Sequence, residues 1–279
     1  MTTYAYQELV YSVDDPVATI AFNRPDALNA FTPRTLAELR HALAAAEADA
    51  RVVGIVITGS GRGFSAGMDM NALADMSKGG SGGSGTEVPR ATPGDTAMGE
   101  NFQGAFTYLL AVRKPVIAAI NGACAGLGMC IAMLCDMRFA ERQAKFTTAF
   151  AQRGLIAEHA ISWILPRLIG SSRALDLLWS ARRFDGEEAV RLGVADRLCD
   201  AGTSAEAAAT YIREIAATAS PTSLKVMKQQ VYRHLNMELG AAMDETNRWM
   251  DESLKRADFR EGVESFMQRR PPRFPRVEG

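Results

Sequence analysis

Gly63-Phe64-Ser65-Ala66-Gly67-Met68-Asp69-Met70 and Asn121-Gly122-Ala123-Cys124-Ala125-Gly126-Leu127-Gly128-Met129-Cys130 are the two glycine-punctuated stretches that decide the fold of this chain. Each follows an apolar, β-branched run that is typical of a buried strand, at 52–58 and at 116–120. Each also leads into a segment that can form a helix. A strand, a glycine turn and a helix start leave backbone N–H groups pointing into the turn.

Two such turns can converge on one carbonyl oxygen and stabilise the negative charge that develops on it. This arrangement is an oxyanion hole. We therefore expect the chain to be an enzyme.

Strand and helix signals alternate through the first two thirds of the chain. We expect a hairpin of Glu8–Val13 and Val17–Phe22, followed by a helix over Thr32–Ala50 that begins with Thr32 as its N-cap. Further strands and helices are expected at 126–134, 137–141, 158–168, 172–180 and 185–192. This alternation is typical of an α/β fold.

Strand signals end near Ser204, and the rest of the chain has helical periodicity. The expected helices are Ala205–Ala219, Thr222–Leu239, Ala242–Arg256 and Phe259–Gln268. We therefore divide the chain into a core at 1–200 and a helical region at 201–279.

Charge and composition narrow the class of protein. With 31 basic and 32 acidic residues the net charge is −1, which gives no reason to expect binding to nucleic acid or to an anionic membrane. No apolar run approaches the roughly 18 residues of a membrane span. We expect a cytosolic protein with reduced, buried thiols and no metal site, because the four cysteines lack metal or redox spacing: Cys124, Cys130, Cys135 and Cys199.

Four motifs in order resemble the crotonase (enoyl-CoA hydratase/isomerase) superfamily over nearly the whole chain: Phe22–Ala30, Phe64–Met70, Asn121–Asp136 with Phe139-Ala140, and Glu264–Pro271. The resemblance implies a spiral of ββα turns and a helical tail that assembles a homotrimer or a hexamer. It also implies an acyl-CoA substrate that reacts through an enolate. Coenzyme A is then part of the substrate, and no separate cofactor is expected.

Carried over position by position, the resemblance assigns the two oxyanion donors to the backbone N–H groups of Met68 and Leu127. It assigns coenzyme A and substrate contacts to Arg24, Asp26, Ala27, Leu28, Ala66, Asp69, Met70, Phe266 and Arg269.

The family's hydratases use two glutamates, and Cys130 and Phe150 stand in those slots here. Glu158 matches the single acid of the isomerases. One base beside an oxyanion hole suits an allylic proton shift, so a Δ3,Δ2-type enoyl-CoA isomerase is the favoured function. Hydration by Glu158 alone is the alternative. We give His159 little weight as a partner of Glu158, because neighbours on a helix point apart.

Two hypotheses from other functional classes remain open. Gly63–Gly67 also fits the G-x-S-x-G elbow of a serine hydrolase, with Ser65 as nucleophile and Asp136 and His159 as partners. The empty glutamate slots also suit a non-catalytic, CoA-binding homologue. The Gly- and Ser-rich segment Ser77–Gly99 is either a lid over the substrate or an inert surface loop.

Overall fold

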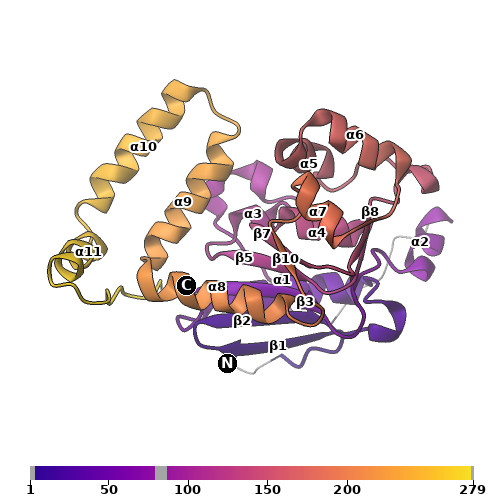
Figure 1. Cartoon of the computed structure of the whole chain (residues 1–279), viewed down its shortest axis with the longest axis horizontal. Coiled ribbons are helices and arrows are strands. Elements are labelled where there is room, and N and C mark those ends of the chain that lie inside the picture. The colour runs from indigo at the N-terminus through magenta and orange to yellow at the C-terminus, as the bar shows by residue number, and fades with distance from the viewer. Residues whose placement is uncertain (1–3, 79–86, 278–279) are drawn as a thin grey trace.

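A six-stranded sheet forms the base of the α/β fold in the computed structural model, which describes residues 4–78 and 87–277 (Figure 1). The first two strands form the expected antiparallel hairpin, and all later neighbours pair in parallel. In spatial order the strands are β1 (Leu9–Asp14), β2 (Val17–Phe22), β3 (Gly54–Gly59), β5 (Val116–Ile120), β7 (Met137–Glu141) and β10 (Arg197–Cys199).

A second sheet of four short strands was not expected from the sequence. It contains β4 (Gly63–Ser65), β6 (Ala123–Ala125), β8 (Lys145–Thr147) and β9 (Phe184–Asp185). The glycine-punctuated stretches, interpreted above as turns alone, therefore begin with strands. Three residues are too few to show a period-2 pattern, so hydrophobic periodicity could not reveal them.

The chain winds through both sheets in repeated ββα units. One unit is β3, β4 and α2 (Met70–Ser77), and the next is β5, β6 and α4 (Leu127–Leu134). Each unit gives one strand to each sheet, so the expected spiral of ββα turns is confirmed. The parallel pairing of β4 with β6 brings the loops after these two strands to the same edge.

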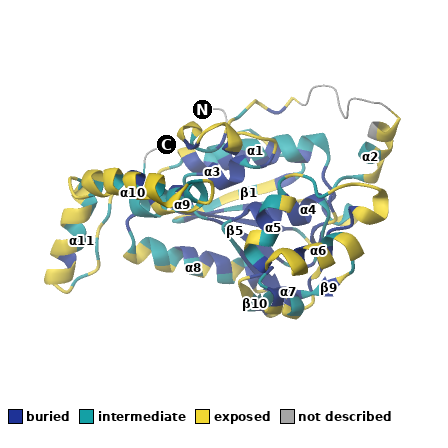
Figure 2. Ribbon diagram, turned by 90° about the horizontal axis from the view of Figure 1, so that it is seen from above, coloured by how far each residue is buried: buried dark blue, intermediate teal, exposed yellow. Residues whose placement is uncertain are grey.

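Strand β3 is buried on both faces because helices cover both sides of the large sheet. Ile55 and Ile57 enter the main core, which also contains residues of α1 (Pro33–Ala48) and α4. Val56 faces the other way, into a smaller cluster with Ile212 of α8 (Ser204–Thr218). Each such side chain contributes about 1.5–3 kcal/mol to folding when fully buried. Helix α8 thus belongs to the packing of the sheet (Figure 2).

Three helices continue from α8 and project from the core as an arm: α9 (Pro221–His234), α10 (Leu239–Ser253) and α11 (Ala257–Met267) (Figure 1). The expected helix Thr222–Leu239 is therefore wrong at its end. After His234 the backbone tightens, with Asn236 N–H bonding Arg233 O and Met237 N–H bonding His234 O. The apolar spacing runs on across this break.

The other helices are short. They are α3 (Tyr108–Ala111), α5 (Ile161–Ile169), α6 (Ser171–Ser180) and α7 (Gly186–Leu192), with single 3₁₀ turns at Pro25–Ala27, Thr96–Met98, Glu100–Phe102 and Ala151–Arg153. None of the helices in the described ranges has the length and apolar character needed to cross a bilayer.

The segment Ser77–Gly99, for which a lid and an inert loop were both considered, lies partly outside the described residues. Its described part is tied to the helices beside it. The Gly94 N–H donates to Glu47 Oε2 of α1 at 2.6 Å, and Asp95 pairs with Lys225 of α9 at 3.3 Å.

Candidate active site

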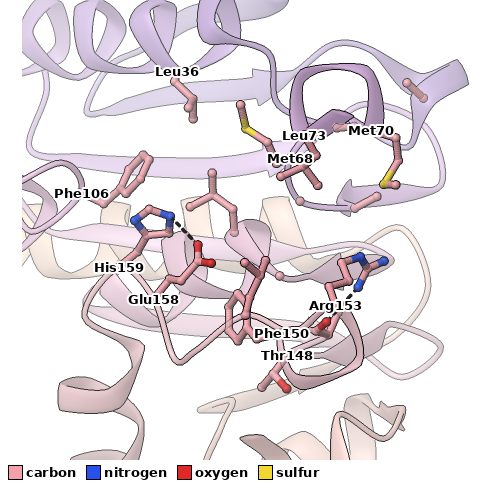
Figure 3. Close-up of a pocket in the computed structure, with 18 residues that line it drawn as sticks. Leu36, Met68, Met70, Leu73, Phe106, Thr148, Phe150, Arg153, Glu158 and His159 are labelled. Atoms are coloured by element: carbon pink, nitrogen blue, oxygen red, sulfur yellow. Dashed lines mark hydrogen bonds and ion pairs between the residues drawn. The ribbon is translucent and has the colours of Figure 1, made fainter. Parts of the chain in front are cut away.

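A cavity of about 410 Å³ lies between the loops that follow β4 and β6 and the turn that precedes α5 (Figure 3). Its wall is mainly apolar. Within the described part of the chain, Glu158 is the single carboxylate on this wall. The predicted site residues that line the cavity are Ala27, Ala66, Met68, Met70, Leu127, Phe150 and Glu158.

Gly67 allows the two loops to approach each other. Its φ of +95° lies in the left-handed region, and a Cβ at this position would stand 2.8 Å from Ala125 O and 3.3 Å from the nitrogen of Leu127. In the same way, a Cβ on Gly128 would stand 2.6 Å from Ser65 O. Glycine is therefore required on both loops for the backbones to meet at the cavity.

The two predicted donor groups lie on this shared edge. Met68 pairs with Phe31 in an isolated bridge, in which Phe31 N–H donates to Gly67 O and Asp69 N–H donates to Phe31 O. These bonds fix the loop and leave the Met68 N–H without a protein acceptor among the described residues. Leu127 is the first residue of α4, where an N–H has no partner within the helix and the helix dipole favours negative charge.

Glu158 does not lie in a helix, which corrects the expected helix at 158–168. Residues Glu158–Ala160 form a turn, and α5 begins only at Ile161. His159 and Ala160 both have positive φ, at 51° and 63°. Two successive left-handed residues reverse the chain and aim the Glu158 side chain into the cavity (Figure 3).

His159 contacts Glu158, and the low weight given to this neighbour was wrong. The His159 Nε2 atom lies 3.1 Å from Glu158 Oε2. Successive residues on a helix would point apart, whereas the left-handed turn brings these two side chains together. The His159 ring also packs edge-on against Phe106, with ring centroids 4.9 Å apart. About one third of each polar side chain remains exposed, so both are open to the cavity.

The two residues that the resemblance places in the glutamate slots of the hydratases are not general bases. Cys130 is buried in α4 and lies behind the wall, and its thiol makes a weak contact with Glu158 O at 3.8 Å. Burial, followed by the nearby Glu158, raises the pKa of the Cys130 thiol well above its ordinary value. Phe150 forms part of the cavity wall and is 5% exposed. Both residues thus shape the site without titrating in it.

Arg24 and Asp69, two predicted coenzyme A contacts, form an ion pair at 3.0 Å outside the cavity wall. Asp69 also accepts the Asn71 N–H at the start of α2. Burial opposes ionisation of Asp69, but the bonds from Asn71 and Arg24 outweigh it and lower the pKa of Asp69. Of the remaining predicted contacts in this region, Asp26 is exposed and Leu28 is half-buried.

Phe266 and Arg269 lie far from this cavity. Phe266 belongs to α11 and Arg269 follows that helix, at the opposite end of the molecule from α2 (Figures 1 and 2). Phe266 is 84% exposed, and Arg269 is also exposed.

The serine hydrolase reading is wrong because its three residues are not assembled. Ser65 is fully buried, donates its hydroxyl to Asn29 O at 2.8 Å and accepts the Gly67 N–H. Asp136 binds Lys228 and Tyr232 beside α9, while His159 binds Glu158. Ser65 stabilises the loop that carries Met68, and no base lies beside it among residues 4–78 and 87–277.

Sequence reasoning missed several residues of the cavity. Leu36 of α1, Leu73 of α2, Phe106 and Arg153 all line it. The helical spacing of Leu36 and Leu73 indicated an apolar face, but such a face does not distinguish a ligand cavity from ordinary core. Phe106 lies in a loop and Arg153 in the 3₁₀ turn Ala151–Arg153, and neither segment has regular periodicity.

Comparisons with known proteins identify the family of this chain. The family model described as enoyl-CoA hydratase/isomerase matches residues 13–276. The chain is 33% identical to the 1,2-epoxyphenylacetyl-CoA isomerase of Escherichia coli K12, covering 94% of this chain and 96% of the relative. It is 30% identical to the peroxisomal Delta(3,5)-Delta(2,4)-dienoyl-CoA isomerase of Arabidopsis thaliana, covering 99% of both.

A crystal structure of enoyl-CoA hydratase from Mycobacterium tuberculosis H37Rv superposes with a TM-score of 0.83 at 26% identity, covering 96% of this chain and 98% of that one. Proteins named as isomerases and as hydratases are thus both similar to this chain.

Proposed function

Because the chain belongs to the enoyl-CoA hydratase/isomerase family and is an enzyme of that kind, we propose that it isomerises 3-enoyl-CoA thioesters to 2-enoyl-CoA thioesters with Glu158 as its one base. The observation that carries this proposal is the position of Glu158. Among the described residues it is the one carboxylate on the cavity wall, and it faces the loops that hold the Met68 and Leu127 N–H groups.

In the proposed reaction the two N–H groups hold the thioester oxygen, and Glu158 carries one proton from C2 to C4. The thioester oxygen accepts hydrogen bonds from the Met68 and Leu127 N–H groups. Glu158 removes a proton from C2, the double bond moves from C3–C4 to C2–C3, and the electrons of the dienolate take a proton from Glu158 at C4. Atoms and charge balance without a water molecule. An oxyanion donor of this type contributes about 3–4 kcal/mol to the stabilisation of the transition state.

Hydration by Glu158 is the second candidate, supported by the similarity to a protein named enoyl-CoA hydratase. Two features favour isomerisation over it. Hydratases position water between two carboxylates, and the corresponding places here hold Cys130, which is buried behind the wall, and Phe150, which is apolar. A single base suffices for a proton shift within one substrate.

The test uses 3-hexenoyl-CoA and, separately, crotonyl-CoA, with products resolved by mass and retention time. We expect a 2-enoyl product of unchanged mass from the first substrate. Replacing Glu158 by Gln should reduce its formation by about 10²–10⁴-fold, the usual contribution of a general base. Asp75→Asn, on the exposed side of α2, is the matched control and should retain activity.

If crotonyl-CoA gives a product that is heavier by one water, the hydratase hypothesis would replace the isomerase hypothesis. If both thioesters bind but neither is converted, the hypothesis of a non-catalytic, CoA-binding homologue would replace the enzyme proposal. Full activity of Glu158→Gln would remove Glu158 from the mechanism.

We also propose that the arm of α9–α11 assembles the chain into a homotrimer or a dimer of trimers. The arm exposes many large apolar side chains, which is unusual for a free surface. They include Met227, Val231, Leu239, Met243, Met250, Phe266 and Met267. In such an assembly Phe266 and Arg269 would approach the coenzyme A of a neighbouring subunit.

Light scattering on a size-exclusion column tests this assembly. The mass should be near three or six times the 30.1 kDa of one chain. Leu239→Asp, at a side chain that is 78% exposed, should lower it, whereas Val10→Asp on β1 should not. A monomeric wild-type protein would contradict the proposal.

A further inference from the structure

We propose that His159 is a positioning residue for Glu158: it holds one carboxylate oxygen and thereby presents the other to the substrate. The inference rests on the proposed function of Glu158 as the base. Figure 3 shows the His159 ring between Phe106 and Glu158, at one end of the cavity.

The polar contact with His159 distinguishes the two oxygens of Glu158. Nε2 of His159 lies 3.1 Å from Oε2. An ionised carboxylate can only accept, so this contact requires Nε2 to carry the hydrogen. Within the described ranges neither carboxylate oxygen has another side-chain partner, and Oε1 is left to take the substrate proton.

The backbone makes the contact depend on this particular turn. His159 and Ala160 adopt φ values of 51° and 63°, a conformation uncommon outside glycine, although histidine is among the residues that adopt it more often. The chain then enters α5 directly, with Ile161 N–H donating to Glu158 O at 3.0 Å. Glu158 and His159 are therefore fixed to the start of one helix, and their relative orientation is set locally.

Phe106 restricts the histidine ring from the other side. The two rings meet at an interplanar angle of 86°, with centroids 4.9 Å apart, and Phe106 itself is buried. Rotation of the imidazole away from Glu158 would give up this edge-to-face contact. The ring thus lies between an apolar contact with Phe106 on one side and a polar contact with Glu158 on the other.

A base must lie within hydrogen-bond reach of the proton that it removes, and small displacements reduce turnover strongly. Without His159 the Glu158 side chain would be free to rotate within the cavity. The loss should fall on kcat, because the rest of the wall, which is mainly apolar and binds the acyl group, is unchanged. This split distinguishes positioning from a general weakening of the site.

The experiment compares His159→Leu with His159→Gln, using 3-hexenoyl-CoA. The amide nitrogen of glutamine can replace Nε2 as a donor, whereas leucine cannot. We expect His159→Leu to lower kcat by about ten- to hundredfold with KM within about twofold of wild type, and His159→Gln to recover most of that loss. In a Glu158→Gln background, His159→Leu should have no further effect on kcat, because there is no base left to position.

Equal losses in the leucine and glutamine variants, or an unchanged kcat in both, would overturn the inference. If His159→Leu does not fold, His159→Asn replaces it, because its shorter amide does not reach Glu158. Failure of the proposed function is seen separately. Full turnover by Glu158→Gln would contradict the role of Glu158 as the base. An inactive Glu158→Gln together with a fully active His159→Leu would contradict only the positioning role of His159.

Discussion

A Cβ atom on Gly67 would lie 3.3 Å from the backbone nitrogen of Leu127. This proximity joins the loop after β4 to the start of α4. The two N–H groups proposed to bind the thioester oxygen come from these two segments. The space between them depends on the missing side chain at Gly67.

Gly67→Ala should therefore damage turnover more than folding of the sheets. The added methyl would stand 2.8 Å from Ala125 O and would force the loops apart. If one donor is lost, kcat should fall by about 10²–10³-fold. Steady-state kinetics with 3-hexenoyl-CoA measure the effect.

Gly99→Ala is the control for this prediction. Gly99 has a similar φ of +99°, but nothing lies within 4 Å of its added Cβ. An alanine there would meet a similar positive φ without the crowding. A comparable loss of kcat in both variants would assign the effect to strain.

Ser65→Ala should destabilise the protein while leaving its chemistry in place. The hydroxyl donates to Asn29 O and accepts from the Gly67 N–H, and both partners are buried. Leaving them unpaired should lower the free energy of unfolding by about 1–3 kcal/mol, measured by urea titration. Turnover of the folded fraction should survive. Labelling of wild-type Ser65 by a fluorophosphonate would contradict this structural role.

Phe150→Ala should extend the acyl preference towards longer chains. Phe150 and Leu155 line both the main cavity and a second apolar cavity of about 460 Å³ beside α6. Removing the ring should join the two spaces. Each further buried methylene would then contribute about 0.8 kcal/mol, or about fourfold in kcat/KM.

A series of 3-enoyl-CoA substrates of increasing length measures this preference. Phe139→Ala is the matched control, because Phe139 is fully buried in the cluster under α8. It should lower stability by about 3–5 kcal/mol without changing the chain-length profile. An unchanged profile in Phe150→Ala would show that the ring does not limit the acyl group.

Lys114 should make stability rise with pH in a defined window. Its ammonium is buried and donates to Ala46 O at 2.9 Å and Asp49 O at 2.7 Å, at the end of α1. Burial lowers the pKa of Lys114 to about 8. The unfolded chain keeps a lysine pKa of about 10.4. Between these values the unfolded state binds more protons, so the free energy of unfolding contributed by Lys114 increases with pH.

Urea titrations of wild type and Lys114→Met, from pH 8 towards about pH 10, measure this contribution as the difference between the two proteins. The free energy of unfolding of the wild type should increase relative to that of Lys114→Met as pH rises. Lys145→Met is the control, since this side chain is 60% exposed and should show no such trend. A difference that does not change with pH would place the Lys114 pKa outside this window.

The central strands of the large sheet could be predicted from the sequence because they are apolar on both faces, whereas the three-residue edge strand β10 was missed. Val17–Phe22 and Val116–Ile120 were predicted with the same bounds as in the structure. The second sheet could not, since β4 and β6 have three residues each and are rich in glycine and alanine. The position of Glu158 in the cavity followed from the resemblance of its motif to that of the isomerases.

The turn at Glu158–Ala160 was missed for a different reason. The apolar spacing of Ile161–Leu168 continues smoothly backwards to Glu158, and no glycine or proline marks the break. A left-handed histidine followed by a left-handed alanine has no sequence signal. The contact between His159 and Glu158 became visible only with the backbone.

Because β4 pairs with β6, the proposed backbone donors lie on one sheet edge, apart from the side chains that handle the proton. The proposed charge-stabilising groups are main-chain atoms at the edge of a sheet, so most substitutions at Met68 or Leu127 preserve them. The proton-handling side chains lie on the turn before α5, outside both sheets. Substitutions in that turn can therefore change the proton-handling side chains while the proposed oxyanion-binding backbone is kept.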